Sequence, residues 1–176
     1  VLLGPLGPDI AKDLGLNAAE KGLMVAMPVL AGAVLRLVNG LLVDRLGPKL
    51  IGAIGQLIVI AGLLTAWLEG VHSFAGILAV GIVLGFAGAS FAVALPLASR
   101  WYPPEHQGTA LGIAGMGNSG TVFAALFAPA LATLVGWNGV LGLAAIPLAI
   151  VFVAYMVMAK DAPDAPAPKP LVAYLE

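Results

Sequence analysis

The sequence predicts an all-α membrane protein, built as a bundle of transmembrane helices. Hydrophobic residues make up 61% of the chain and charged residues only 10%, with a mean hydropathy of +1.05. A soluble domain carries about 25% charged residues. Five apolar runs account for the difference, and four of them contain no Asp, Glu, Lys or Arg. Because about 20 apolar residues cross the hydrocarbon core of a bilayer, each run is long enough to span it.

These runs predict five complete spans in chain order. The first of them contains a single arginine near its middle. The short segments between the runs carry the charges or the turn residues. The predicted spans are residues 23–43, 50–68, 74–98, 109–136 and 139–159, with outer loops around residues 69–73 and 137–138.

A sixth, partial span is predicted at the N-terminus, over residues 1–10. This segment is apolar but too short to cross a bilayer, and it begins at Val1 instead of a methionine. It lacks the positively charged start and the cleavage site of a signal peptide. We therefore expect the end of a first helix whose start is missing, and one helical bundle over residues 1–160. The sequence has no cysteine, which excludes disulfides and cysteine-bound metals.

The distribution of positive charges predicts the orientation in the membrane. Lysine and arginine in short loops favour the cytoplasmic side. One side of the predicted bundle receives two lysines and the other receives five cations, which places residues 44–49, residues 100–107 and both termini in the cytoplasm. Residues 161–176, rich in proline and alanine, are predicted to be a cytoplasmic linker. The two groups of cations are Lys12 and Lys21 against Arg45, Lys49, Arg100, Lys160 and Lys169.

Arg36 is the candidate functional residue of the first complete span. An arginine at the centre of a transmembrane helix costs about 2.5–3.5 kcal/mol on insertion scales, and such residues face a bundle interior and mark a pathway. No carboxylate lies inside any predicted span. The sequence therefore predicts that the partner of Arg36 is an anion that passes through the membrane. The alternative is a structural arginine that pairs with backbone carbonyls or with the missing half.

Small and polar residues predict where the helices meet. Helices in lipid associate through close packing, so glycines at helical spacing favour interfaces. Gly81, Gly85 and Gly108 are predicted to pack against neighbouring helices. Asn39 and Gln56 are predicted to form hydrogen bonds between helices.

The segment GLLVDRLGPK, residues 40–49, carries a more specific pattern. It resembles the loop between the second and third helices of the major facilitator superfamily, a family of secondary transporters. The matching residues are Gly40, Asp44, Arg45, Gly47 and Lys49, whereas Pro48 replaces a basic residue. The resemblance implies a cytoplasmic latch between the two halves of a transporter. Residues 100–108 resemble the link between the fourth and fifth helices of the same family.

A glycine-rich segment in the fifth span narrows the resemblance. GIAGMGNSGT, residues 112–121, is similar to the signature of the nitrate/nitrite porter family, which also carries an arginine in its second helix. Residues 85–96 resemble the fourth helix of these porters. The resemblance implies that the substrate is bound by Arg36, Asn118 and Phe91, with Gly115, Gly117 and Gly120 beside them.

The resemblance implies the N-terminal, six-helix half of a twelve-helix transporter, with its first helix truncated. The transporter would move nitrate or nitrite across the inner (plasma) membrane by alternating access. Its partners would be the anion, the lipid bilayer and a missing C-terminal half. No nucleic-acid partner, cofactor or metal is expected, and no arrangement of residues suggests an enzyme.

Two alternatives remain open at this point. A transporter of the same superfamily could carry another small anion, such as a monocarboxylate, because carboxylates also pair with a guanidinium fork. A membrane module without transport activity, such as a channel subunit, would also contain apolar spans.

Overall fold

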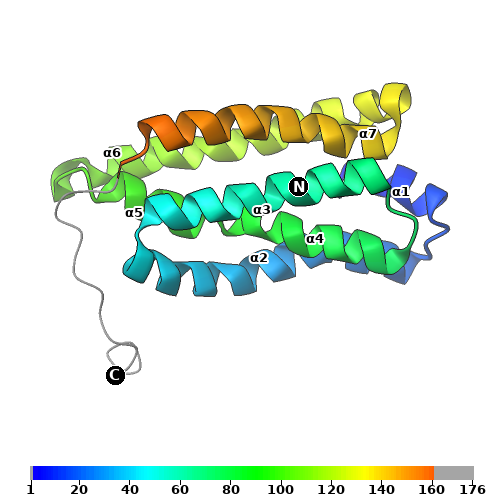
Figure 1. The fold of residues 1–176 in the computed structure, drawn as a ribbon, viewed down its shortest axis with the longest axis horizontal. Coiled ribbons are helices and arrows are strands. Elements are labelled where there is room, and N and C mark those ends of the chain that lie inside the picture. Colours follow the sequence, from blue (N-terminus) through cyan, green and yellow to red (C-terminus); the bar gives the residue numbers. More distant parts are fainter. Residues whose placement is uncertain (1, 161–176) are drawn as a thin grey trace.

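A computed structural model describes residues 2–160, and these residues form helices connected by turns, without a strand (Figure 1). The predicted linker at residues 161–176 lies outside this part of the chain. The elements are α1 (Gly7–Asp13), α2 (Ala18–Leu46), α3 (Pro48–Glu69), α4 (Phe74–Ala89), α5 (Phe91–Ser99), α6 (Pro104–Gly115), the 3₁₀ turn η1 (Met116–Ser119) and α7 (Gly120–Met158).

The long helices lie side by side, and the chain reverses direction at the two ends of the bundle (Figure 1). One end holds the α2–α3 and α5–α6 turns, and the other holds α1, the α3–α4 turn and a reversal within α7. Four helical stretches are long and apolar enough to cross a membrane: Ala18–Leu46, Pro48–Glu69, Phe74–Ser99 and Pro104–Met158. The last of them contains two of the five predicted spans.

The reversal within α7 occurs at Gly136, one residue before the predicted loop at residues 137–138. Gly136 has φ 74° and ψ 161°, a backbone conformation that suits glycine. The chain therefore reverses next to the predicted loop, but Trp137 itself is helical and only 6% exposed, and it belongs to the core. A single glycine is therefore sufficient to fold the last helix back along the bundle.

The N-terminal segment also differs from the prediction. A helix exists, but it covers Gly7–Asp13 instead of residues 1–10, and turns precede it. Pro8 and Asp9 lie in its first turn, where proline needs no donor and a negative charge is favourable. Leu3, Leu6 and Ile10 are at most 1% exposed, so the segment closes one end of the bundle.

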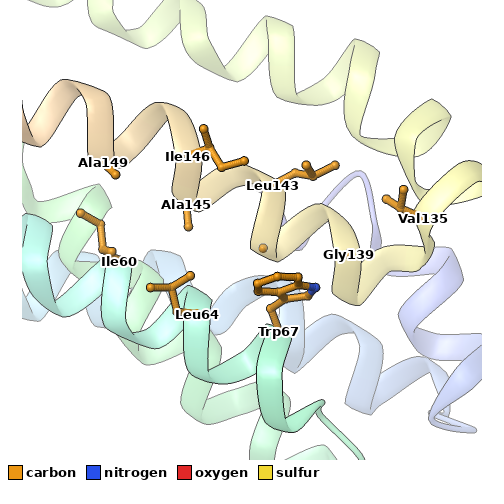
Figure 2. A pocket seen from close by; sticks show the side chains of 10 residues that line it. Ile60, Leu64, Trp67, Val135, Gly139, Leu143, Ala145, Ile146 and Ala149 are labelled. Carbon is orange, nitrogen blue, oxygen red and sulfur yellow. The ribbon is translucent and has the colours of Figure 1, made fainter.

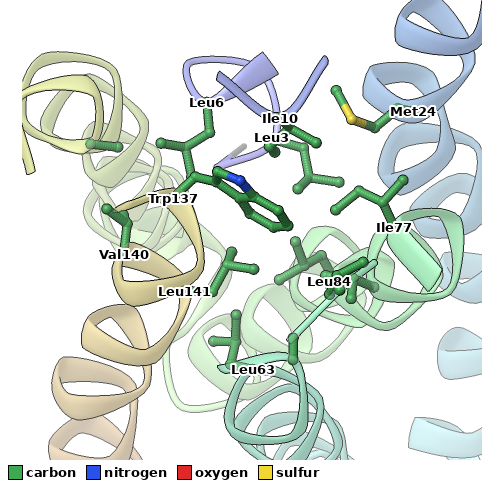
Figure 3. Close-up of a cluster of buried hydrophobic side chains, with 14 of the residues drawn as sticks. Leu3, Leu6, Ile10, Met24, Leu63, Ile77, Leu84, Trp137, Val140 and Leu141 are labelled. Atoms are coloured by element: carbon green, nitrogen blue, oxygen red, sulfur yellow. The ribbon is translucent and has the colours of Figure 1, made fainter. Parts of the chain in front are cut away.

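The main core lies at this same end of the bundle, around Trp137 (Figure 3). Leu6 and Ile10 from the N-terminal segment, Ile77 from α4 and Leu141 from α7 surround the indole ring. The indole Nε1 donates a hydrogen bond of 2.9 Å to Asp13 Oδ2. A buried indole N–H is thereby satisfied, and α1 is tied to α7.

The helices α2 and α4 cross in close contact through glycines. A Cβ atom on Gly85 would lie 2.6 Å from Ala31 Cβ and 2.9 Å from the Gly32 backbone nitrogen. On Gly81 it would lie 3.2 Å from Met27 Cβ. The predicted packing role of Gly81 and Gly85 is confirmed. The same prediction for Gly108 is wrong within the described residues, because nothing lies within 4 Å of its Cβ position.

The second half of α7 packs on α3 through Trp67 (Figure 2). The ring of Trp67 lies against Gly142. A Cβ atom on Gly142 would lie 2.5 Å from the indole ring. An apolar pocket of about 410 Å³ remains beside this contact, between Ile60, Leu64 and Ile146. These apolar outer surfaces suit a bundle surrounded by lipid.

Candidate functional site: an open groove around Arg36

Arg36, the first candidate residue, lies on α2 where this helix packs against α4. One turn earlier, a Cβ atom on Gly32 would lie 3.2 Å from the Gly85 carbonyl oxygen, so the two backbones nearly touch. This close approach brings α4 within reach of the guanidinium. Arg36 Nη2 donates a hydrogen bond of 3.0 Å to the Gly88 carbonyl oxygen.

The acceptor of this bond lies beside a helix break. Between α4 and α5, the Ser90 N–H bonds at 3.3 Å to the carbonyl oxygen of Ala87, three residues back instead of four. Ser90 Oγ donates to the same oxygen at 2.7 Å. Kinks at glycine and serine pairs are common in helices. The Gly88 carbonyl therefore lies where the helical ladder is interrupted, and Arg36 provides a donor for it.

Asn118 lies in a second interruption, the 3₁₀ turn η1. Such turns within a helix are tighter than the α-helix and are frequent at functional hinges. Thr121 Oγ1 donates to the Asn118 carbonyl oxygen at 2.7 Å. Among residues 2–160, nothing lies within 4 Å of the Cβ positions of Gly117 and Gly120, and Asn118 is exposed. The turn thus presents an amide group beside open space.

These elements enclose an open groove of about 840 Å³. It brings together Arg36, Asn118, Phe91, Gly117 and Gly120, which the sequence places on three separate segments. The remaining predicted binding residue, Gly115, does not line it. Most of the other lining residues are apolar, and they include Pro28, Val29, Leu63, Leu84, Leu95 and Ala124.

The charge of Arg36 is the main electrostatic feature of this groove. Within residues 2–160, no carboxylate forms an ion pair with its guanidinium. A guanidinium has five N–H donors, and the bond to Gly88 uses one of them. An uncompensated positive charge with unused donors, in a mostly apolar wall, is suited to bind an anion.

The predicted latch lies at the end of the bundle where α2 turns into α3. Arg100 Nη2 and Asp44 Oδ1 form a salt bridge of 2.9 Å, which joins the end of α2 to the residue after α5. Gly47 adopts φ 85°, which lets the chain turn sharply between the two helices. Pro48 takes the first position of α3, where the missing N–H costs nothing.

The structure gives only the exposure and surroundings of the other predicted latch residues, Gly40, Arg45 and Lys49. Arg45 is exposed, Lys49 is half-buried, and nothing lies within 4 Å of the Cβ position of Gly40.

Three features of the site were not predicted from the sequence. They are the Gly88 carbonyl as a partner of Arg36, the helix break at Ser90, and Arg100 as the partner of Asp44. The glycine and serine pair at residues 88–90 was the signal available for the break. The two pairings join residues more than 50 positions apart, and no local pattern marks such contacts.

Comparison with known proteins agrees with this architecture. The profile of the Major Facilitator Superfamily matches residues 1–174. The chain is 38% identical, over 166 residues, to the probable nitrate/nitrite transporter NarK2 of Mycobacterium tuberculosis. It is 32% identical to the nitrite extrusion protein of Bacillus subtilis and 31% identical to the probable nitrate transporter NarT of Staphylococcus carnosus.

These alignments cover most of this chain but less than half of each relative. The alignment with NarK2 covers 92% of this chain and 41% of NarK2. The corresponding shares are 85% of this chain and 38% of the nitrite extrusion protein, and 98% of this chain and 44% of NarT. The predicted resemblance to nitrate/nitrite porters is confirmed, and the relatives are transporters instead of enzymes. With its apolar helices and its matched family profile, the chain is a multi-pass membrane protein that belongs to the major facilitator superfamily.

Proposed function

We propose that this bundle is one half of a secondary transporter for nitrate or nitrite, which binds the anion in the groove around Arg36. The names of the relatives support this choice of substrate. The chain spans about two fifths of their length, and we propose that a second six-helix half closes the open side of the groove.

One observation carries the proposal: Arg36 and Asn118 line the same groove. Nitrate and nitrite are small planar anions with oxygen acceptors, and the fork of a guanidinium binds planar oxyanions through two parallel bonds. The Asn118 amide adds a neutral donor. Phe91 lines the groove as a flat apolar surface, which limits the size and orientation of the anion.

In this proposal the transporter works by rocking its two halves around a site near the bilayer midplane. The Asp44–Arg100 end faces the cytoplasm in this proposal, as the positive-inside rule requires. Both termini of the complete six-helix half would lie on that side, whereas α1 of this chain lies at the opposite end of the bundle. The membrane is the inner (plasma) membrane. The latch residues Gly40, Asp44, Arg45, Gly47 and Lys49 hold the two halves together on the cytoplasmic side when the site opens outward.

Replacing Arg36 by lysine tests the proposal directly. Lysine keeps the positive charge but loses the fork, so one charge-assisted hydrogen bond of about 1.5–3 kcal/mol disappears. We expect the KM for nitrate or nitrite uptake by proteoliposomes to rise about 10- to 100-fold. The matched control is Lys21→Arg, an exchange of the same two residue types in the same helix but outside the groove. Unchanged uptake by Arg36→Lys would contradict the proposed binding mode.

The two alternatives make different predictions in the same assay. If the substrate were a monocarboxylate, monocarboxylates would compete with labelled nitrite more strongly than unlabelled nitrate does. If the bundle belonged to a channel, flux would rise in proportion to concentration without saturating. A saturable flux that nitrate inhibits and monocarboxylates do not inhibit supports the nitrate or nitrite transporter.

A further inference from the structure

Two residues with hydroxyl groups, Ser90 and Thr121, line the groove beside the residues that carry the proposed function. Ser90 lies two residues after Gly88, whose carbonyl oxygen accepts the hydrogen bond from Arg36. Thr121 lies three residues after Asn118. Ser90 is exposed and Thr121 is half-buried. The groove therefore has two O–H donors besides the guanidinium and the Asn118 amide.

Each of these hydroxyls donates to a carbonyl oxygen three residues earlier in the chain. Ser90 Oγ bonds to the Ala87 carbonyl oxygen at 2.7 Å. Thr121 Oγ1 bonds to the Asn118 carbonyl oxygen, also at 2.7 Å. Thr133 in α7 makes the same kind of bond at the same length, but it does not line the groove. Such bonds are a local property of serine and threonine in helices, and what distinguishes Ser90 and Thr121 is their position.

The two carbonyl oxygens do not depend on the hydroxyls alone. The Ala87 carbonyl oxygen also accepts the Ser90 backbone N–H at 3.3 Å. The Asn118 carbonyl oxygen also accepts the Gly120 backbone N–H. Each hydroxyl can therefore turn its proton away without leaving a carbonyl oxygen that has no donor. Rotation about the C–O bond is sufficient, because a hydroxyl hydrogen turns to suit its acceptor.

An anion is a stronger acceptor for these protons than a neutral carbonyl oxygen. Hydrogen bonds in which one partner is charged are about twice as strong as those between neutral groups. A hydroxyl has a single proton, so it cannot donate to the carbonyl oxygen and to an anion at the same time. With an anion between Arg36 and Asn118, the exchange of the weaker acceptor for the stronger one is favourable.

We propose that Ser90 and Thr121 are two further ligands of the anion, and that each exchanges its carbonyl acceptor for an oxygen atom of the bound anion. This inference rests on the proposed function and adds two neutral donors to the guanidinium fork and the Asn118 amide. The added donors lie on both helix interruptions, one between α4 and α5 and one directly after η1. Small oxyanions accept several hydrogen bonds at once, so they can use donors from both segments.

Uptake of labelled nitrate and nitrite by proteoliposomes that contain the intact protein tests the proposal. Ser90→Ala and Thr121→Val each remove one hydroxyl with little change in shape. We expect the KM to rise about three- to tenfold in each variant, while the maximal rate and Tm stay close to wild-type. Thr121→Ser keeps the hydroxyl and is expected to restore the lower KM. The matched control is Thr133→Val, which removes the same kind of bond outside the groove and is expected to leave the KM unchanged.

The outcomes separate this inference from the proposed function. If Arg36→Lys raises the KM but both hydroxyl variants behave like the control, the hydroxyls are not ligands and only this inference is wrong. A lower Tm with an unchanged KM would show a structural role and would also overturn it. A rise in the KM of one variant alone would overturn the assignment of the other residue. If the intact protein shows no saturable uptake of either anion, the proposed function fails and this inference fails with it.

Discussion

Arg36 binds a backbone carbonyl and, in the proposed function, also binds the anion. Its bond to Gly88 holds one nitrogen of the guanidinium at 3.0 Å and fixes the orientation of the plane. The carbonyl dipole offsets part of the cost of a charge at membrane depth, but it does not neutralise the charge. The remaining donors stay available to an anion. A lysine has no planar fork and cannot serve both partners with the same geometry.

Asn118 is the second residue for which the groove makes a sharp prediction. In Asn118→Ala the anion loses one hydrogen bond, and because this bond involves a charged group we expect a rise of about tenfold in the KM for uptake. Asn118→Asp places a carboxylate beside the anion and is expected to reduce uptake further. Ser119→Ala is the control, because Ser119 belongs to the same turn but does not line the groove. Equal uptake by Asn118→Ala and Ser119→Ala would remove Asn118 from the site.

At the scale of elements, the crossing of α2 and α4 sets the position of Arg36. Glycines on both helices let the backbones approach, and the guanidinium then reaches the end of α4. The helix breaks at Ser90 and at η1 also help to position the site, because each interrupts a regular helix where its residues line the groove. Packing therefore determines the site as much as the polar residues do.

Replacing Gly85 by alanine tests this dependence. The added methyl group would lie 2.9 Å from the Gly32 backbone nitrogen, an atom that cannot rotate away. Overpacking costs about 1–3 kcal/mol, so we expect a lower Tm and reduced uptake together. The control is Gly22→Ala in α2, where the Cβ position has no neighbour within 4 Å and alanine favours the helix. If both variants kept wild-type Tm and uptake, the close crossing would not determine the site.

At the scale of the whole molecule, polar contacts close both ends of the bundle, whereas the groove and the two helix breaks lie between these ends. Asp13 and Trp137 join α1 to α7 at one end. At the other end, Asp44 bonds Arg100, and the Tyr155 hydroxyl donates to the Pro48 carbonyl oxygen at 3.0 Å. This distribution favours rigid ends around an interior that can change its packing.

A double-mutant cycle of Asp44→Asn and Arg100→Gln measures the contact at the latch end. The side chains are 22% exposed for Arg100 and 38% for Asp44, so solvent screens the pair, and we expect a coupling free energy of about 0.5–1 kcal/mol. Because Asp44 has a further interaction, its single variant should lose more stability than the pair alone contributes. The coupling should fall at high salt. Additive effects on the free energy of unfolding would show that the pair contributes nothing.

The sequence predicted the helices well because the bilayer imposes strong local rules. All five predicted complete spans lie within the four long helical stretches, except for residue 159 at the end of the last span. The helix α2 begins after a capping box at Asn17 and ends before Gly47. The reversal at Gly136 was predicted one residue too late, at residues 137–138. Gly108 was misjudged because its spacing resembles that of Gly81 and Gly85, although nothing lies near it in the described residues.

The sequence by itself therefore determined which stretches form helices long and apolar enough to cross a membrane, and that one of them carries an arginine near its middle. Both follow from composition along the chain, since about 20 apolar residues span the hydrocarbon core and a charge within them is costly. Only the tertiary structure decided that Arg36 bonds Gly88 and that Asn118 lines the same groove. These contacts depend on how closely the helices approach one another, a distance that no single segment of sequence contains.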